Sequence, residues 1–472
     1  MNRIETDLCI IGAGSGGLSL AAGAAQMGAR VVLLEGGQMG GDCLNTGCVP
    51  SKALIAAAKA AQTVRNAAKF GIASGEPEID FAAVKDYVAK VIADIAPNDS
   101  QERFEGLGVQ VIREWGKFIS PTEVAAGETV IKARRFVIAT GSHAAIPPID
   151  GIESVPYLTN ETIFGQRDRP EHLLVLGGGP IGMEMAQAHR RLGCKVTVIE
   201  GFKAFGRDDP ETSAIVMAAL RAEGVTILEG NGVVRLRKTE SGIEMVLADG
   251  SRINGSHLLE AAGRQVAVDK LDLAAAGVTH SKKGISVGAD LRTSNRRIYA
   301  IGDVAGGLQF THVASAHSGI VIRQALLGLP AKFSTKSIPW VTYCEPELAQ
   351  VGLTEAEARK TYGAAVTVLR TDFAHNDRAH AEGKAKGLIK VMVVKGRPVG
   401  ASIAGPQAGE LISLWALAIS SGQKISAIAT MTAPYPTLGE ISKRTAGAYF
   451  SPKLFDNPLL KGFVKFVQRS LP

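Results

Sequence analysis

Two stretches of the chain, far apart in the sequence, repeat one pattern of apolar and small residues. The first has an apolar run at 7–11, a glycine-rich turn, a helix of small residues and a second apolar run at 31–34. The second stretch has the same order, with apolar runs at 173–176 and 196–199. Short apolar runs bounded by glycine predict buried strands, so each stretch predicts a strand–turn–helix–strand unit.

Each turn has the spacing G-x-G-x-x-G, and each second strand ends in a glutamate. Glycine at these positions lets the backbone approach a pyrophosphate, and the start of the helix supplies N–H groups and the positive end of its dipole. The glutamate can accept hydrogen bonds from ribose hydroxyls. Two complete copies therefore predict two separate dinucleotide sites. The residues are Gly12, Gly14, Gly17 and Glu35 in the first copy and Gly177, Gly179, Gly182 and Glu200 in the second.

The remaining apolar runs extend this architecture and indicate where the domains end. Two further strands close in small turns, Thr140-Gly141 and Gly302-Asp303. After residue 336 the pattern changes to alternating strands, such as 388–394, which indicates a separate C-terminal domain. We therefore predict an α/β fold with two Rossmann-like dinucleotide-binding domains and a C-terminal α+β domain. The expected ranges are 1–150 and 271–335 for the first domain, 151–270 for the second, 336–449 for the third and 450–472 for a tail.

Length and composition narrow the class of partner. The chain of 472 residues is long enough for about three domains. Its formal charge of +7 comes from basic residues spread along the whole chain, and aromatic residues make up only 5%. This pattern is typical of a mildly basic surface and argues against nucleic acid as a partner. The apolar segment 8–25 is rich in glycine and follows acidic residues, so we interpret it as strand, turn and helix instead of a signal peptide and expect a cytoplasmic protein.

One pair of cysteines lies among residues that can activate a thiol. Cys43 and Cys48 lie in a glycine-rich segment that ends at Lys52, and Cys48 falls where a long alanine-rich helix is expected to begin. A thiolate at a helix N-terminus is stabilised by the helix dipole, and the cation of Lys52 adds to the effect. A disulfide between the two sulfurs needs a distorted first turn, which the residues between them can supply. The alternative is two unpaired thiols beside a nucleotide-binding turn.

With both turns and this cysteine segment, the sequence resembles the pyridine nucleotide–disulfide oxidoreductases, the group that contains dihydrolipoamide dehydrogenase, glutathione reductase and mercuric reductase. The resemblance implies FAD at the first turn, a nicotinamide dinucleotide at the second and a homodimer formed by the C-terminal domain. NADH is the expected donor, with NADPH as the alternative, because the carboxylate of Glu200 repels a 2′-phosphate. Cys48 is implied as the thiolate nearest the flavin and Cys43 as the sulfur that exchanges with substrate. The other residues that the resemblance assigns to the cofactor sites or the catalytic centre are Gly41, Lys52, Thr140, Gly141, Glu184, Gly263, Arg264, Gly302 and Asp303.

The sequence departs from this family at one catalytic position. Disulfide-reducing members carry His-Pro-Thr-x-x-Glu in the C-terminal region, where the histidine acts as acid and base for the leaving thiol. Here the segment begins with Tyr435 and ends with Glu440. Tyrosine, with a reference pKa near 10, is a poor proton shuttle at neutral pH. Our first hypothesis is electron transfer through the cysteine pair to a small dithiol or disulfide substrate, as in dihydrolipoamide dehydrogenase, with Tyr435 and Glu440 as further catalytic residues.

Two other electron acceptors stay open. A mercuric reductase also has tyrosine at this position, but it ends in a vicinal cysteine pair, whereas this chain ends Arg469-Ser-Leu-Pro472. A flavin reductase of quinones or oxygen would use the dithiol only to store electrons. A non-catalytic subunit is disfavoured, because a scaffold needs neither the nucleotide sites nor the dithiol. We expect no resident metal site, since the histidine pairs 312 and 317, and 375 and 380, do not have a recognised metal-ligand spacing.

The tail has the pattern of a short basic amphipathic helix. One helical face is apolar, and cations step at four-residue spacing along another. Such a helix can lie on an anionic membrane surface. It can also pack against the C-terminal domain, and we expect this second arrangement because short apolar helices usually find protein. The apolar residues are Leu460, Phe463, Val464 and Val467, and the cations are Lys461, Lys465 and Arg469.

Overall fold

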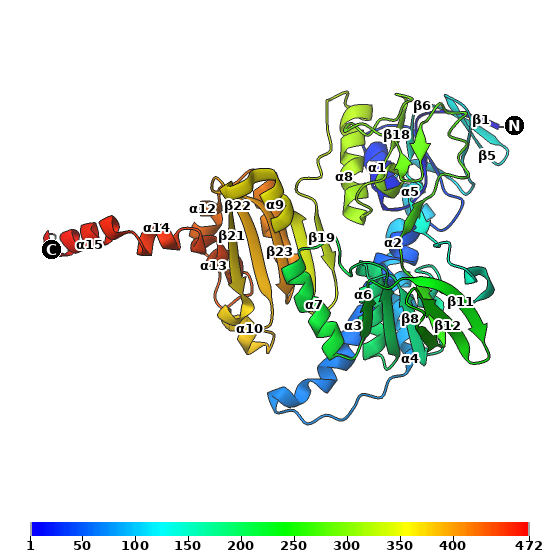
Figure 1. Ribbon diagram of the computed structural model, residues 1–472. Coiled ribbons are helices and arrows are strands. Elements are labelled where there is room, and N and C mark those ends of the chain that lie inside the picture. Colours follow the sequence, from blue (N-terminus) through cyan, green and yellow to red (C-terminus); the bar gives the residue numbers. More distant parts are fainter. Residues whose placement is uncertain (1, 471–472) are drawn as a thin grey trace. The chain divides into compact units, whose positions relative to one another are not determined.

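The computed structural model describes residues 2–470 and divides the chain into two compact units (Figure 1). The first unit contains the residues up to Phe202 and Val225–Ser334. The second contains Lys203–Gly224 and the residues from Thr335 onward. Two largely parallel sheets with helices and smaller antiparallel sheets form the first unit, and an antiparallel sheet with helices forms the second, which confirms the predicted fold class. Residues 203–224, which we expected in the nicotinamide-binding domain, belong to the second unit.

The first sheet is built around the N-terminal apolar run. Its strands lie in the order β3-β2-β1-β6-β5-β4, with β18 beside β6. The β1, β2, β3, β6 and β18 pairs are parallel, and all four residues of β2 are buried, as expected for a parallel strand covered on both faces. The bounds are β1 Asn2–Ile11, β2 Val31–Leu34, β3 Val109–Ile112, β4 Lys117–Ser120, β5 Glu123–Ala126, β6 Thr129–Ile138 and β18 Ile298–Ala300.

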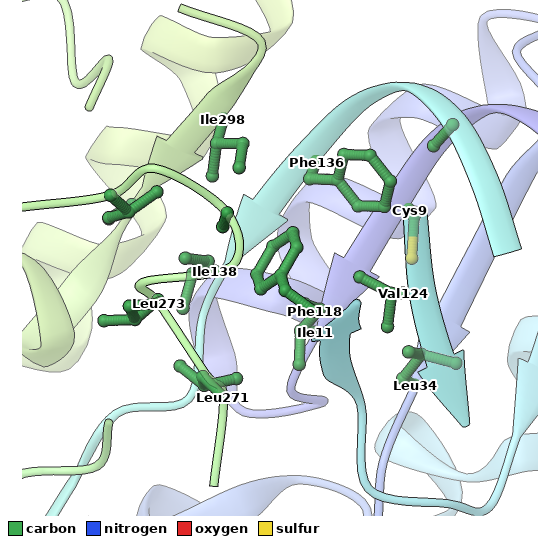
Figure 2. Close-up of a cluster of buried hydrophobic side chains, with 14 of the residues drawn as sticks. Cys9, Ile11, Leu34, Phe118, Val124, Phe136, Ile138, Leu271, Leu273 and Ile298 are labelled. Atoms are coloured by element: carbon green, nitrogen blue, oxygen red, sulfur yellow. The ribbon is translucent and has the colours of Figure 1, made fainter. Parts of the chain in front are cut away.

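An apolar core covers part of this sheet. Figure 2 shows Cys9, Ile11 and Leu34 among the buried side chains of this cluster. The rings of Phe118 and Phe136 meet edge to face there, with their centroids 5.4 Å apart. Cys9 is fully buried, and burial raises the pKa of its thiol. This cysteine is therefore a core residue.

The second glycine turn begins a smaller parallel sheet, with the order β10-β9-β8-β14. Helix α6 (Pro180–Arg191) follows β8, and the chain then returns as β9 beside it. Helix α1 (Ser15–Gln26) makes the same connection between β1 and β2, which confirms the predicted strand–turn–helix–strand repeat. The bounds are β8 His172–Leu176, β9 Lys195–Glu200, β10 Thr226–Glu229 and β14 His257–Glu260. Between β10 and β14 the chain forms a separate antiparallel sheet of β11 Val233–Thr239, β12 Gly242–Leu247 and β13 Arg252–Gly255.

Helices of the first unit carry the cysteine segment. The second of them, α3, begins at Cys48, as predicted. Two short strands, β7 (Ser142–Ala144) and β15 (Arg264–Val266), pair antiparallel and join the segments that leave the two parallel sheets. The helix bounds are α2 Gly41–Asn45, α3 Cys48–Arg65, α4 Phe81–Ile95, α5 Gln101–Gly106 and α8 Thr311–Val321.

A five-stranded antiparallel sheet forms the centre of the second unit, with the order β19-β20-β23-β22-β21. The indole of Trp415 is fully buried in its core and donates a hydrogen bond to Ser442 Oγ at 3.2 Å. The strand bounds are β19 Pro339–Thr342, β20 Glu347–Gly352, β21 Val366–Asp372, β22 Leu388–Val394 and β23 Arg397–Gly405. The helices are α9 Glu355–Tyr362, α10 Asp377–Ala381, α11 Ala408–Ser420, α12 Ile425–Thr430 and α13 Glu440–Ala448.

A buried charge cluster holds α7 (Pro210–Ala222) in the second unit. The ammonium of Lys390, on β22, lies 2.9 Å from Asp209 Oδ2, 2.9 Å from Glu211 Oε2 and 2.8 Å from Glu355 Oε2. Asp209 caps α7 by accepting a hydrogen bond from the Glu211 N–H, and its side chain is fully buried. Because a buried charge is stable only when it is paired, this cluster fixes where α7 docks on the sheet.

The tail forms two helices, α14 (Ser451–Phe455) and α15 (Pro458–Ser470), which extend away from the sheet of the second unit (Figure 1). No described side chain of α15 is buried, so the expected packing of its apolar face against the C-terminal domain is wrong for the single chain. Asn457 caps α15 and starts it as a helix separate from α14, and no part of the sheet of the second unit covers its apolar face. Residues 471–472 of the predicted tail lie outside the described residues.

None of the helices within residues 2–470 is long and apolar enough to cross a bilayer.

Removal of the Lys390 cation should destabilise the second unit. Lys390→Ala leaves the buried carboxylate of Asp209 without its counter-ion, so we expect the free energy of unfolding to fall by on the order of 3–5 kcal/mol. The exposed Lys386 on the same segment provides the control, and Lys386→Ala should change stability by less than about 0.5 kcal/mol. Equal losses in the two variants, measured by urea unfolding of the flavin-loaded protein, would contradict this account of α7.

Candidate active site

The two glycine turns have the same backbone geometry. Gly12 and Gly177 have φ values of +108° and +112°, in the region that favours glycine, and a Cβ on either would lie 2.5 Å from a carbonyl oxygen. A Cβ on Gly17 or Gly182 would lie 1.9 or 2.1 Å from the carbonyl oxygen of the first glycine of its turn. The chain's own packing therefore requires glycine at all four positions.

Glycine occupies the middle position of each turn for a different reason. Gly14 and Gly179 are both extended, with φ −80° and ψ −175° and −179°, a conformation that any residue adopts. No atom lies within 4 Å of the position that a Cβ would take on either residue. Neither conformation nor internal packing requires glycine there, so the open space serves a group that comes close to the backbone. A dinucleotide pyrophosphate at the N-termini of α1 and α6 fits this requirement.

The glutamate that ends the second strand is held in the same way in both copies. One carboxylate oxygen accepts a hydrogen bond from an N–H of the glycine turn, 22 residues earlier, and the other accepts one from the N–H two residues later. The carboxylate therefore lies at the turn, where the ribose of a dinucleotide bound there belongs. For Glu35 the donors are Ala13 and Gly37, both at 2.6 Å, and for Glu200 they are Gly178 at 2.8 Å and Phe202 at 2.9 Å.

The two copies differ at one buried position. Ile138 pairs with Ile11, just before the first turn, and Glu260 pairs with Leu176 at the equivalent place in the second copy. Glu260 is 2% exposed and accepts a hydrogen bond from the Ala262 N–H at 2.7 Å, while its second oxygen has no hydrogen-bond partner among the described residues. Burial raises the pKa of Glu260 to about 7. The second copy therefore has a carboxyl that titrates near neutral pH where the first copy has an isoleucine.

A break between α2 and α3 brings the two cysteines together. Cys43 lies in α2, and Cys48 is the first residue of α3. The two sulfurs are not bonded to each other in this structure, and the thiol of Cys43 is a hydrogen-bond partner of Cys48. The hydroxyl of Thr311, on α8, lies 3.4 Å from Cys48 Sγ.

The environment of the pair separates the pKa values of its two thiols. The hydrogen bond from Cys43, helped by the Thr311 hydroxyl and the charge of Lys52, lowers the pKa of Cys48 to about 6 against the effect of burial. The same hydrogen bond raises the pKa of Cys43. At neutral pH, Cys48 is therefore mainly a thiolate and Cys43 a thiol.

An ion pair lies next to this sulfur. Lys52, one turn after Cys48 on α3, donates a hydrogen bond to Glu184 Oε2 on α6 at 2.8 Å. The side chain of Glu184 is only 6% exposed, so the pair is partly shielded from water. The structure thus brings together two of the residues that the resemblance assigned to the cofactor sites or the catalytic centre, 132 positions apart in the sequence.

Asp42, next to Cys43, ties the cysteine segment to two other parts of the first unit. Its Oδ1 accepts hydrogen bonds from Thr46 Oγ1 at 2.7 Å and from Asn160 Nδ2 at 2.8 Å. Its Oδ2 accepts one from Arg264 Nη2 at 2.8 Å. Both carboxylate oxygens are therefore occupied, and the break between α2 and α3 is held from both sides.

Arg264 continues this network to the end of β18. Its Nε donates to Ser142 Oγ at 2.7 Å, and the Ser142 hydroxyl donates to Asp303 Oδ2 at 2.5 Å. Burial raises the pKa of Asp303. The preceding Gly302 N–H donates to His317 Nδ1 at 3.1 Å, so this histidine is a core acceptor, and burial lowers its pKa to about 4.

The other predicted cofactor residues lie in the turns next to these groups. Gly41 approaches the first turn so closely that a Cβ on it would lie 2.8 Å from the Cα of Gly14. The remaining contacts are Thr140 Oγ1 to the Ala267 carbonyl at 2.6 Å, the Gly141 carbonyl with the Ala267 N–H at 3.0 Å, and the Gly263 carbonyl with the Ala145 N–H at 3.1 Å.

Sequence reasoning missed four residues of this site. Asp42 could have been found, because an acid beside a redox-active cysteine is a visible signal. Ser142, Asn160 and Thr311 could not, because each is an ordinary polar residue more than 90 positions from the cysteines, and only the fold brings it there.

Tyr435 and Glu440 belong to the second unit. The Tyr435 side chain is exposed, and its hydroxyl donates a hydrogen bond to Asp377 Oδ2 at 2.9 Å. This bond raises the pKa of Tyr435, which makes the phenol a still weaker acid. Glu440 is the first residue of α13, and its Oε2 accepts a hydrogen bond from the Thr437 N–H at 3.3 Å.

Comparison with known proteins identifies the family. The sequence profile described as pyridine nucleotide-disulphide oxidoreductase matches residues 6–318, and the dimerisation-domain profile of the same family matches residues 338–446. The chain belongs to the pyridine nucleotide-disulphide oxidoreductase family. As a member of that family it is an FAD-dependent enzyme, and its second cofactor is NAD(P)H.

Similar members of this oxidoreductase family differ in their names. A mercuric reductase of Streptomyces lividans is 35% identical over 457 residues, which cover 94% of this chain and 96% of the relative. A dihydrolipoyl dehydrogenase of Thermus scotoductus is 36% identical over 448 residues, which cover 92% of this chain and 95% of the relative. The structure of the HOCl-induced flavoprotein disulfide reductase RclA from Escherichia coli, in a Cu(II) complex, superposes with a TM-score of 0.84 at 28% identity over 93% of this chain and 99% of that chain.

The two kinds of turn glycine in this oxidoreductase should respond differently to alanine. Gly179→Ala meets no atom of the protein, so we expect an unchanged melting temperature but a KM for NADH raised on the order of tenfold. Gly182→Ala places its Cβ 2.1 Å from a backbone oxygen and should destabilise the fold itself. Unchanged NADH kinetics in a stable Gly179→Ala enzyme would contradict the proposed pyrophosphate position.

The pKa of Cys48 gives a second test. In the reduced enzyme, alkylation of Cys48 by iodoacetamide should rise with pH and reach half its maximal rate near pH 6, because only the thiolate reacts. Peptide mass spectrometry distinguishes Cys48 from Cys43, whose raised pKa should keep it slow at neutral pH. A half-maximal rate above pH 8 for Cys48, or faster labelling of Cys43, would contradict the assignment.

Proposed function

We propose that this enzyme passes electrons from NADH through the Cys43–Cys48 pair to a soft metal ion. The observation that carries the proposal is the pair itself, with a thiolate-forming Cys48 hydrogen-bonded to Cys43 beside the Lys52–Glu184 ion pair. Soft metal ions prefer thiolate ligands, and two adjacent sulfurs offer a chelating site. We further infer that the enzyme is a cytoplasmic homodimer, in keeping with its dimerisation domain.

Both cofactors would be held by residues of the two repeated units. The first turn, with Glu35, would hold FAD, which when bound accepts hydride from a nicotinamide and transfers electron pairs to a disulfide. The second turn, with Glu200, would hold NADH, since a carboxylate at this position disfavours the 2′-phosphate of NADPH. Lys52 would keep positive charge next to the Cys48 thiolate and favour its ionised form.

The proposed reaction balances in electrons and protons. Oxidation of the dithiol to a disulfide releases two electrons and the remaining thiol proton. One Hg(II) ion would take up both electrons to give Hg(0), whereas two Cu(II) ions would take up one electron each to give Cu(I). NADH then supplies two electrons that restore the dithiol. A metal ion has no leaving thiol, so its reduction does not require a general acid in the place of the family's histidine.

Tyr435 is the reason to prefer a metal ion over a disulfide substrate. Its phenol is bonded to Asp377 and has a raised pKa, so it is a poor donor of a proton to a leaving thiolate. The relatives named mercuric reductase and the Cu(II) complex of RclA support the same choice. A dithiol or disulfide substrate is the second candidate, favoured by the relative named dihydrolipoyl dehydrogenase.

A panel of acceptors tests the proposal. With NADH as donor, we expect Hg(II) or Cu(II) to support a higher kcat/KM than lipoamide does, and Tyr435→His to raise the lipoamide rate on the order of 10²-fold. A wild-type enzyme that prefers lipoamide would contradict the metal proposal. The Cys43→Ser variant is the control for the pair. Loss of metal reduction in this variant is expected, whereas full retention of turnover with a quinone or oxygen would support direct reduction by the flavin.

A further inference from the structure

Helix α15 begins independently of the rest of the chain. Asn457 Oδ1 accepts hydrogen bonds from the N–H groups of Leu459 at 3.0 Å and Leu460 at 3.3 Å, and Pro458 occupies the first helical position. A capped helix of 13 residues is nevertheless marginal in water, because most helical stability in proteins comes from burial of an apolar face. The helix therefore needs a surface that covers this face.

The apolar face of α15 is open to solvent in the single chain. Leu459 is 83% exposed, Phe463 61% and Phe466 64%. These side chains project from one half of the helix circumference, since residues three, four and seven positions apart share a face. The other members of this face are Leu460, Val464 and Val467.

All the charged residues of the opposite face are cations. Lys461, Lys465 and Arg469 repeat every four residues along it, all three are exposed, and α15 contains no acidic residue. An apolar face with phenylalanine and leucine, and a polar face of lysine and arginine, is the pattern of helices that lie in the interface of an anionic bilayer. The cations would reach the lipid phosphates while the apolar side chains enter the acyl boundary.

The segment that precedes α15 also exposes apolar side chains. Helix α14 contributes exposed Leu454 and Phe455 to an open groove of about 560 Å³ that it shares with α12 and α13. The one charged residue that lines this groove is Arg444, a cation. The apolar and cationic character of α15 is thus not confined to one helix.

A second copy of the chain fits this surface less well. The dimerisation-domain match ends at residue 446, before α14 and α15 begin. Two tails packed against each other would also bring cationic faces together without acids to pair them. An anionic surface matches the charge and covers the apolar face at once.

We propose that α15, together with Leu454 and Phe455, binds the surface of a membrane that contains anionic lipid. The inference is independent of the electron acceptor, because it depends only on the tail. It assigns the enzyme to a peripheral position on the bilayer through a helix that lies flat at the interface.

Vesicle flotation of the flavin-loaded full chain tests the proposal. We expect binding to vesicles of phosphatidylcholine mixed with phosphatidylglycerol, much weaker binding to phosphatidylcholine alone, and a decrease with added salt. The triple variant Lys461→Gln, Lys465→Gln, Arg469→Gln should lower the partition coefficient on the order of 10²-fold. Phe463→Ser with Phe466→Ser should lower it as well, with NADH oxidation unchanged in solution.

A control variant removes the same charge elsewhere. Lys238, Lys282 and Lys283 are exposed in the first unit, and their joint replacement by glutamine should leave vesicle binding unchanged. An equal loss of vesicle binding in the control and tail variants would show that overall charge, and not the tail, causes the binding. This result would overturn the proposal. Absence of wild-type binding to the anionic vesicles would overturn it too, and so would tail variants that dissociate the dimer in sedimentation while vesicle binding persists.

Discussion

The cysteine segment is held in place by one carboxylate, that of Asp42. Cys43 and Cys48 can meet only because the chain breaks between α2 and α3, and Asp42 accepts three side-chain hydrogen bonds at this break. One comes from Thr46 within the break, and the other two come from Asn160 and Arg264 in distant segments. Because both oxygens of the carboxylate are used, the segment cannot shift without leaving a buried or half-buried polar group unpaired. The position of the sulfurs is therefore set by the same network that joins the two nucleotide-binding parts.

In the proposed function, electrons reach the cysteine pair from the cofactors held by the two repeated units. Each copy uses two glycines for internal packing and leaves a third, Gly14 or Gly179, facing open space at a helix N-terminus. The ion pair of Lys52 and Glu184 links α3, which begins at Cys48, with α6, which begins at the second turn. This ion pair thus connects the helix that begins at Cys48 with the helix that begins at the expected nicotinamide site. Glu260 breaks the symmetry of the repeat, because a carboxyl that titrates near neutral pH replaces a core isoleucine next to the second turn.

Local features of this protein could be predicted from its sequence, and long-range ones could not. The turns, the terminal glutamates and the helix start at Cys48 follow from spacing, because each depends on residues within about 25 positions. Thr311 approaches Cys48 only because α8 lies against the first unit's N-terminal helix, and no local pattern marks it. Residues 203–224 look like part of the second dinucleotide domain, yet Lys390 pairs with Asp209 and holds them in the other unit. The tail was predicted as a helix, but the pattern does not say which surface covers its apolar face, and in the single chain that face is exposed.

The claim that the cysteine pair carries electrons is tested most directly by anaerobic titration with NADH. A dithiol–disulfide couple stores two electrons, so the oxidised wild-type enzyme should consume one more equivalent of NADH per subunit than the Cys43→Ser variant before reduction is complete. Free-thiol counting at the end point should find the Cys43 and Cys48 thiols newly exposed in the wild-type enzyme. Equal NADH consumption by the two proteins, both flavin-loaded, would show that the pair does not take part in electron transfer and would contradict the account.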